Sequence, residues 1–260
     1  MSYVASEHIF RWGFKSKIIK FCVDPIARLK GTTAVTTVRE ILNKIKSGTS
    51  VCIFAEGNRS FNGITNEILP STGKLAKLSG VTLVTYKFIG GYLTSPRWSK
   101  SLRRGKMEGK IVKVYSPEEL KNMKPDEINS AIKRDLFVDA YADQEREKIA
   151  YKGENLAEHL ETTLCICPKC GKMGTMKSSG DDFFCTSCSF KVSYSEYGYF
   201  EGEDVPYKTV LSWDNFQNEK LLDYLPFTDE NISAKEIAIA LSDTYKPIYI
   251  TVIRDGKEVE

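Results

Sequence analysis

Apolar residues recur along the first half of the chain in two patterns, one typical of helices and one typical of buried strands. Residues 36–46 and 72–79 carry apolar side chains at helical spacing, and a glycine typical of a helix end follows each segment. Residues 51–54 and 81–89 are β-branched and aromatic runs that indicate buried strands. Helices and strands that alternate across short connections predict an α/β fold, with a largely parallel sheet flanked by helices.

Further elements follow the same reasoning. We expect a strand at 110–115, a helix that begins at Pro117, and a longer amphipathic helix from Pro125 to about Lys148. Residues 1–23 interleave apolar and aromatic side chains with lysine and arginine, which suits one amphipathic helix or two short ones. Two interpretations of this segment stay open. It packs on the core as a first helix, or it lies with a basic amphipathic face on anionic lipid.

Composition places the chain among ordinary globular proteins, at 42% hydrophobic and 27% charged residues. The net charge of +3 is too small to argue for a nucleic-acid partner. The sequence contains no apolar run of about eighteen residues and no signal-peptide pattern. Five of the seven cysteines lie between residues 165 and 188, which suits a reducing compartment and a metal site. We therefore expect a cytoplasmic protein, peripheral at the inner face of the membrane.

The crowded cysteines form two C-x-x-C pairs separated by fourteen residues, Cys167 with Cys170 and Cys185 with Cys188. Each pair presents two thiolates from one tight turn, and two facing turns complete a tetrahedral shell suited to Zn²⁺. A turn at 178–182 predicts a β-hairpin between the pairs, so the module is typical of a zinc ribbon. Four thiolates leave no open position, and the zinc is therefore expected to be structural. The alternative is a set of redox-active or incidental cysteines.

The composition changes near residue 150, and we expect three parts. Residues 1–150 form the α/β domain, residues 151–195 a linker helix and the zinc ribbon, and residues 196–260 a small β-rich region. The chain enters its first element abruptly, and its last strand, 247–253, runs into a turn without a partner. We therefore expect an α/β domain that is incomplete at its N-terminus and a C-terminal region that is truncated.

Residues 54–60, Phe-Ala-Glu-Gly-Asn-Arg-Ser, are the strongest candidate for a binding site. They place a carboxylate, a glycine, an amide, an arginine and a hydroxyl at the carboxyl end of the strand at 51–54. Ligands gather at the carboxyl ends of strands in open α/β sheets. The alternative is an ordinary strand exit with a solvated salt pair.

The run from Ser50 to Ser60 resembles the phosphate-site motif of the glycerolipid acyltransferases, the 1-acyl-sn-glycerol-3-phosphate (lysophosphatidic acid) acyltransferase family. That motif usually reads F-P-E-G-T-R-S. Four positions match, Glu56, Gly57, Arg59 and Ser60, whereas Ala55 and Asn58 replace the usual proline and threonine. Weaker similarity joins 25–28 and 73–84 to neighbouring blocks of the family. The resemblance covers about residues 1–115, and only its 56–60 block is specific.

The resemblance implies a glycerol-phosphate acyltransferase-like fold and an enzyme of phospholipid biosynthesis. Such an enzyme transfers an acyl group from acyl-CoA or an acyl carrier protein to lysophosphatidate or a similar glycerol phosphate. Arg59 would bind the acceptor's phosphate, and Arg28 would add a second cation. Glu56 would orient Arg59 or the acceptor, and Gly57 would let the backbone approach closely. Asn58 and Ser60 complete the expected phosphate-binding set.

The family's general base, the histidine of an H-x4-D block, has no counterpart in the chain. His8 is followed five residues later by Gly13 instead of an acid, and His159 lies beside the cysteines. Catalytic residues are therefore unassigned, and we expect this chain alone to be inactive. Either the block lies upstream of Met1, or the protein is a lipid-binding pseudoenzyme. A non-catalytic protein whose zinc ribbon and basic loop at 97–106 engage nucleic acid or a protein partner is a further alternative, with nucleic acid disfavoured by the mild charge.

Overall fold

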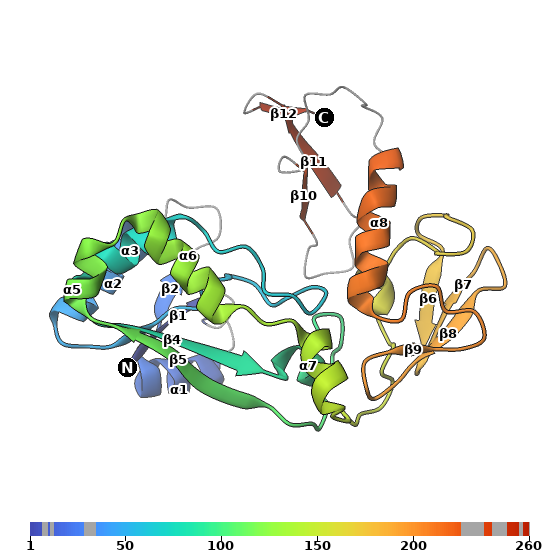
Figure 1. Ribbon diagram of the computed structural model, residues 1–260, viewed down its shortest axis with the longest axis horizontal. Helices are drawn as coiled ribbons and strands as arrows, with labels where there is room; N and C mark the ends of the chain where they lie inside the picture. Colours follow the sequence, from blue (N-terminus) through green and yellow to red (C-terminus); the bar gives the residue numbers. More distant parts are fainter. Residues whose placement is uncertain are drawn as a thin grey trace. The chain divides into compact units, whose positions relative to one another are not determined.

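The computed structural model describes residues 1–6, 10, 13–28, 35–224, 237–240, 249–254 and 257–259. The chain divides into two compact units, Met1–Gln217 and Asn218–Glu260. The first unit holds an α/β part and a small β-sheet with the cysteines, and the second unit holds a separate sheet (Figure 1). Within the described part of the chain, no helix has both the length and the apolar character needed to span a membrane.

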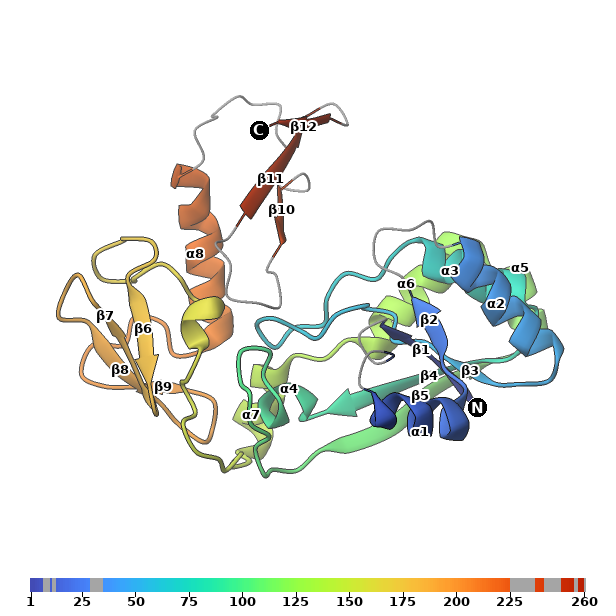
Figure 2. The ribbon, with the colours of Figure 1, turned by 180° about the vertical axis from the view of Figure 1, so that it is seen from behind.

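The first unit begins with a three-stranded parallel sheet in the order β2-β1-β3. Its strands are β1 (Ser2–Ser6), β2 (Ile26–Arg28) and β3 (Val51–Cys52). Helices α1 (Phe14–Val23) and α2 (Val35–Lys46) link them in turn, and α2 packs on β2 and β3 (Figure 2). The chain is therefore a mixed α/β protein with a parallel sheet. Strand β1 occupies residues that the sequence pattern had assigned to a helical segment.

The next two strands, β4 (Leu83–Ile89) and β5 (Glu108–Tyr115), pair antiparallel, so parallel pairing does not extend through all of the described strands. Their connection contains only the short helix α4 (Gly91–Thr94). A parallel return requires a longer crossover connection, and without one the chain comes back alongside the strand it left. Thr85 is buried on the face that α6 covers, whereas Val84, Tyr86 and Phe88 are exposed on the other face.

Three helices and Tyr115 form the core of the α/β part. The helices are α3 (Ser71–Ser79), α5 (Pro117–Asn122) and α6 (Pro125–Leu136). Buried residues of α5 and α6 gather with a loop residue and a strand residue into one cluster, and the partly buried Ala76 of α3 packs against it. The members of the cluster are Ile68, Tyr115, Leu120, Ile128, Ala131 and Ile132. The Tyr115 hydroxyl donates to Asp135 Oδ2 at 2.6 Å, and the Thr85 hydroxyl donates to the same oxygen at 3.0 Å. Burial, together with the neighbouring carboxylate, raises the pKa of Tyr115 to about 12.

The helix predicted from Pro125 to Lys148 is in fact two helices, α6 and α7 (Ala140–Glu147). The residues between them are extended and pair with the loop that follows residues 54–60. The backbone N–H of Val138 donates to Thr65 Oγ1 at 2.8 Å, and the N–H of Thr65 donates to the Val138 carbonyl at 3.1 Å. Asp139 then caps α7 by accepting from two backbone N–H groups.

An antiparallel sheet carries the cysteines. Its strands, in the order β6-β7-β8-β9, are β6 (Met176–Ser179), β7 (Asp182–Cys185), β8 (Lys191–Tyr194) and β9 (Phe200–Glu201). The predicted hairpin turn is confirmed, with Gly180 at φ +64°. The linker helix expected between residue 151 and the cysteines is only the single turn η2 (Leu160–Thr162), because His159 is left-handed at its start. Helix α8 (Val210–Tyr224) contributes Trp213 to the core of this sheet.

The second unit contains a three-stranded antiparallel sheet in the order β10-β11-β12. Its strands are β10 (Ile237–Ala240), β11 (Tyr249–Arg254) and β12 (Lys257–Val259). The strand expected at 247–253 is present as β11. The expectation that it lacks a partner is wrong, because β11 pairs with a strand on each side.

Candidate functional site

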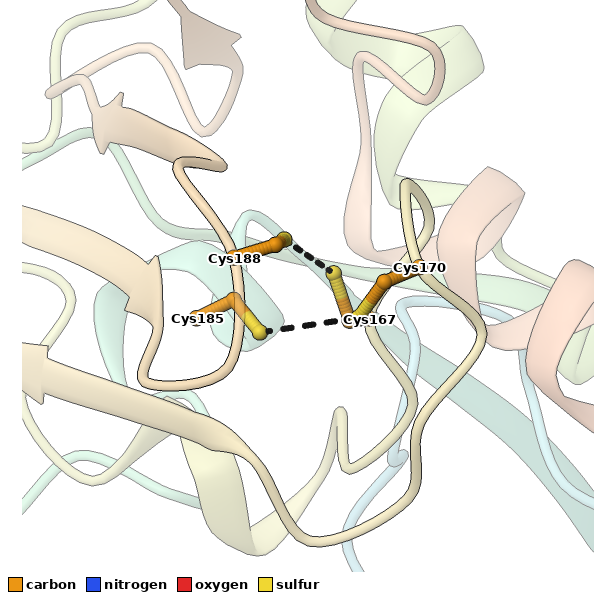
Figure 3. A group of neighbouring side chains, drawn as sticks. All are labelled: Cys167, Cys170, Cys185 and Cys188. Atoms are coloured by element: carbon orange, nitrogen blue, oxygen red, sulfur yellow. Dashed lines mark hydrogen bonds between the residues drawn. The ribbon is translucent and has the colours of Figure 1, made fainter.

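The four cysteines predicted as ligands meet at one point of the first unit (Figure 3). All four sulfur atoms lie within 4.8 Å of one another. The Sγ atoms of Cys167 and Cys188 are 3.7 Å apart, and those of Cys170 and Cys185 are 3.8 Å apart. A tetrahedral ion with Zn–S bonds of about 2.3 Å separates its sulfurs by about 3.8 Å. The cluster therefore has the donor set and the spacing of a closed four-thiolate metal site.

Each half of this cluster is shaped by its own turn. Gly171 N–H donates to the Cys167 carbonyl at 2.9 Å, and Gly171 has φ +72°, which closes the first turn after Cys170. The second turn is closed by Cys185 N–H, which donates to the Phe190 carbonyl at 2.9 Å. Cys165 lies outside the cluster, and its N–H donates to the Gln217 side chain.

Hydrogen bonds to sulfur favour a thiolate at Cys185. Burial raises the pKa of this thiol. The hydrogen bond between Cys185 Sγ and Thr175 Oγ1, together with those from the backbone N–H groups of Ser187 and Cys188, outweighs the effect of burial and lowers the pKa to about 6. Burial raises the pKa of Cys167 to about 12 when no metal is bound. A bound metal ion would instead lower the pKa of Cys167, because a coordinating thiol is deprotonated.

The 54–60 loop lies at the carboxyl edge of the parallel sheet. Strand β2 ends at Arg28 and the neighbouring β1 at Ser6, while β3 ends at Cys52, just before the loop. Gly57 N–H donates to the Phe54 carbonyl at 3.0 Å, so the loop begins with a tight turn. The sheet thus brings Arg28 and the loop to the same edge.

Arg28 lies directly against Gly57. A Cβ atom added to Gly57 would be 3.1 Å from Arg28 Nη1, and Gly57 has φ +72°. The side chains of Arg28 and Arg59 are exposed, and neither has an ion-pair partner among the described residues. Two guanidinium groups therefore lie at this loop, and a Cβ atom at position 57 would make a close contact with that of Arg28.

Other predicted site residues serve mainly to shape the loop. Glu56 Oε2 accepts the Asn66 N–H at 2.7 Å, and burial raises the pKa of Glu56 although this hydrogen bond opposes the rise. The Asn58 carbonyl accepts from the Asn66 side chain at 3.3 Å. Ser60 Oγ donates to the Ile64 carbonyl at 2.7 Å and accepts the N–H of Gly63 at 2.9 Å, which closes a turn at residues 60–64.

Ser95 and Arg97 contact the loop from a distant part of the sequence. Arg59 Nη1 donates to Ser95 Oγ at 3.1 Å, so Ser95 holds the guanidinium that Glu56 was expected to orient. The Arg97 guanidinium lies 4.1 Å from the centre of the Phe61 ring. Arg97 belongs to the basic loop that sequence reasoning singled out. No sequence motif identifies Ser95 as a contact of Arg59. It lies in the connection between β4 and β5, and the fold of that connection places it beside the loop.

The structure brings no histidine to the described parts of this loop. His8 lies outside the described residues, and the N–H of His159 donates to Ser178 Oγ beside the cysteine sheet. The assignment of catalytic residues therefore remains open, as the sequence had left it.

No protein-family model matches the chain, and no curated protein matches its sequence. Among solved structures, the chain is similar to the 1-acyl-sn-glycerophosphate (LPA) acyltransferase PlsC from Thermotoga maritima, with a TM-score of 0.46 and 19% identity. The match covers 56% of this chain and 56% of the PlsC chain. At this TM-score and identity, the similarity assigns neither a family nor an activity to the chain.

Proposed function

We propose that the 54–60 loop and Arg28 bind the phosphate of a glycerol phosphate acceptor in an acyltransferase of phospholipid biosynthesis. The observation that carries the proposal is the placement of Arg28 against Gly57, in a loop that also carries Arg59. A planar guanidinium offers paired N–H donors that match a phosphate, and two such groups suit a doubly charged phosphomonoester. The acceptor would be lysophosphatidate or a similar glycerol phosphate.

The reaction would join the acceptor's hydroxyl oxygen to the acyl carbonyl carbon and break the thioester C–S bond. The hydroxyl proton would leave through a general base and reach the departing thiolate. The donor would be acyl-CoA or an acyl carrier protein. Arg28 and Arg59 would position the acceptor and would not move this proton. Because the base is unassigned, binding rather than turnover is the direct test of the site.

We also propose that the four cysteines hold one structural Zn²⁺. The sulfur spacing and the closed set of four thiols support this choice over a catalytic ion, which needs an open position. In this role the metal would brace the cysteine sheet and take no part in acyl transfer.

Contact with a membrane surface is the third part of the proposal. On α1, Phe14, Ile18 and Phe21 share one face, with exposed fractions of 76%, 49% and 92%. Lys17 and Lys20 are exposed on the same helix. Apolar and aromatic side chains beside lysines suit the surface of a bilayer with anionic lipids.

The test of the phosphate site is the affinity of the chain for lysophosphatidate and for sn-glycerol 3-phosphate, measured by titration calorimetry. Arg59→Ala is expected to weaken both affinities about 10-fold or more, because it removes charge-assisted hydrogen bonds of about 1.5–3 kcal/mol. Arg146→Ala is the matched control, since Arg146 pairs with Asp143 on α7. Equal affinities in the wild type and Arg59→Ala would refute the phosphate role. Binding without acyl transfer, even with upstream sequence added, would identify a pseudoenzyme.

A further inference from the structure

A path of hydrogen bonds links the first cysteine turn to the loop that follows Ser60. Cys165 N–H donates to Gln217 Oε1 at 3.0 Å, and Gln217 Nε2 donates to Asp214 Oδ1 at 2.8 Å. Asn62 Nδ2 donates to the other carboxylate oxygen of Asp214 at 2.8 Å. The path therefore starts two residues before the metal-ligand candidate Cys167 and ends two residues after Ser60.

Each member of this path is held by further contacts. Gln217 is 5% exposed, and its Nε2 also donates to the Thr163 carbonyl at 2.7 Å. Asn62 Oδ1 accepts the Ile64 N–H at 3.2 Å, so its amide is fixed at both ends. On the same helix as Asp214, Trp213 Nε1 donates to the Ile166 carbonyl at 2.9 Å, directly before Cys167. Helix α8 is thus anchored to the cysteine turn at two points.

A second connection leads to Arg59 through Arg103 and Ser95. Arg103 is 3% exposed, and its Nη2 donates to the Leu156 carbonyl at 2.6 Å. Its guanidinium also lies 5.3 Å from the centre of the Tyr194 ring on β8. The Arg103 N–H donates to the Thr94 carbonyl at 2.8 Å, which holds the segment that presents Ser95 to Arg59. The region around the cysteines is therefore connected to the 60–64 turn by one set of contacts and to the segment that holds Arg59 by another.

We propose that Asp214 and Gln217 are positioning residues that couple metal binding at the four cysteines to phosphate binding at Arg28 and Arg59. This inference rests on the proposed function of both sites. The metal fixes the turn at Cys167, the turn fixes Gln217 and Asp214, and Asp214 fixes the turn that contains Ser60. Because coupling between two binding sites is reciprocal, zinc and the phosphate ligand each raise the affinity of the other by the same factor.

Asn62 and Asp214 allow a test in which the interaction is broken and then restored. Asn62→Asp keeps the oxygen that accepts from Ile64 but places a carboxylate against Asp214. Asp214→Asn replaces one of the two accepting oxygens by an NH2 group, so one of the two donors, Asn62 or Gln217, then faces another donor and its hydrogen bond is lost. In the double variant, the new amide at position 214 donates to the new carboxylate at position 62 and still accepts from Gln217. Both hydrogen bonds are then restored with the formal charge of the wild type.

The experiment measures the zinc affinity of the full chain, by competition with a chromogenic chelator, with and without saturating sn-glycerol 3-phosphate. In the wild type the ligand is expected to raise the zinc affinity about 5-fold or more. Each single variant loses this effect, and the double variant regains it. Asp182→Asn and Asn122→Asp make the same charge changes away from the path and should keep the wild-type response.

Retention of the wild-type effect in both single variants, or failure of the double variant to regain it, would overturn the coupling. A folded wild type that binds zinc but not sn-glycerol 3-phosphate would refute the proposed phosphate site instead. In that case, hydrogen exchange of backbone amides 54–64 measures whether zinc binding at the cysteines affects the loop. Slower exchange on zinc binding in the wild type and the double variant, but not in the single variants, supports the inference, and an equal zinc response in all four proteins rejects it.

Discussion

Gly57 illustrates how much of the candidate site depends on a single residue. Its backbone is left-handed, and a Cβ atom added to it would lie 3.1 Å from Arg28 Nη1, a tight contact. These two constraints have different consequences. The left-handed backbone affects the free energy of unfolding, whereas the close contact affects the position of the Arg28 guanidinium. Gly80 has only the first of them, since it has φ +66° and nothing within 4 Å of an added Cβ atom.

Alanine at each glycine separates the two constraints. Gly57→Ala and Gly80→Ala should each lower the free energy of unfolding by about 1–2 kcal/mol, the cost of a left-handed conformation for a residue with a Cβ atom. Only Gly57→Ala should also weaken binding of sn-glycerol 3-phosphate, because Arg28 has to move. Urea unfolding and calorimetry measure the two effects. Equal affinities in the two variants would show that Arg28 does not need its place against Gly57.

At the residue scale, sequence motifs located the candidate sites better than they predicted the role of each side chain. The cysteine spacing was sufficient to predict that four thiols meet, because each C-x-x-C pair is a local turn. The 54–60 motif predicted a loop at a sheet edge, but not that Ser95 would hold Arg59 or that Ser60 would close a turn. Those contacts depend on long-range pairing, which no local pattern encodes.

The helices lie largely where the apolar periodicity of the sequence predicts them. They differ from the prediction where the backbone pairs with a distant part of the chain. Helices α2 and α3 begin within one residue of their predicted starts. The amphipathic pattern from Pro125 to Lys148 continues across a break at Val138, where the backbone pairs with Thr65 instead. A helix continued through this point would lose that pairing and the cap at Asp139. The competing partner lies 73 residues away in the sequence, so helical periodicity could not reveal it.

The exposed apolar face of helix α1 is predicted to bind the membrane surface. The double variant Phe14→Ser/Phe21→Ser should weaken binding to vesicles that contain anionic phosphatidylglycerol by about 10-fold or more, since burial of each ring in the interface is worth about 1.5–3 kcal/mol. Co-sedimentation measures the binding. The double variant Leu78→Ser/Phe137→Ser removes exposed apolar side chains from other parts of the chain and is the matched control. Equal loss in both double variants would argue against α1 as the membrane contact.

At the scale of the whole molecule, the cysteine cluster belongs to a hydrophobic core of the first unit. Cys167 and Cys185 are buried with Trp213 and Tyr194, which lie on α8 and β8. Metal binding should therefore contribute to the stability of the entire first unit, because an ion that binds only the folded chain stabilises it by mass action. The same core includes Trp98 and Tyr141, and the Tyr141 ring lies close to Gly63 in the turn that follows Ser60.

Metal analysis should find about one zinc per chain. Cys170→Ser should lose the ion and lower the free energy of unfolding by about 4 kcal/mol when free zinc exceeds its dissociation constant about 1,000-fold. Cys22→Ser replaces an exposed thiol on α1 and should change neither quantity. Native protein without metal, or Cys170→Ser with undiminished zinc, would contradict a structural zinc site.

The contact between Asn62 and Asp214 has a consequence for how the protein can evolve. A carboxylate and an amide can exchange places across this contact without loss of a hydrogen bond, whereas two carboxylates repel and two amides leave one donor too many. A change at one position therefore alters which residues are tolerated at the other. Related chains that keep both sites should vary at positions 62 and 214 together, although 152 residues separate them in the sequence.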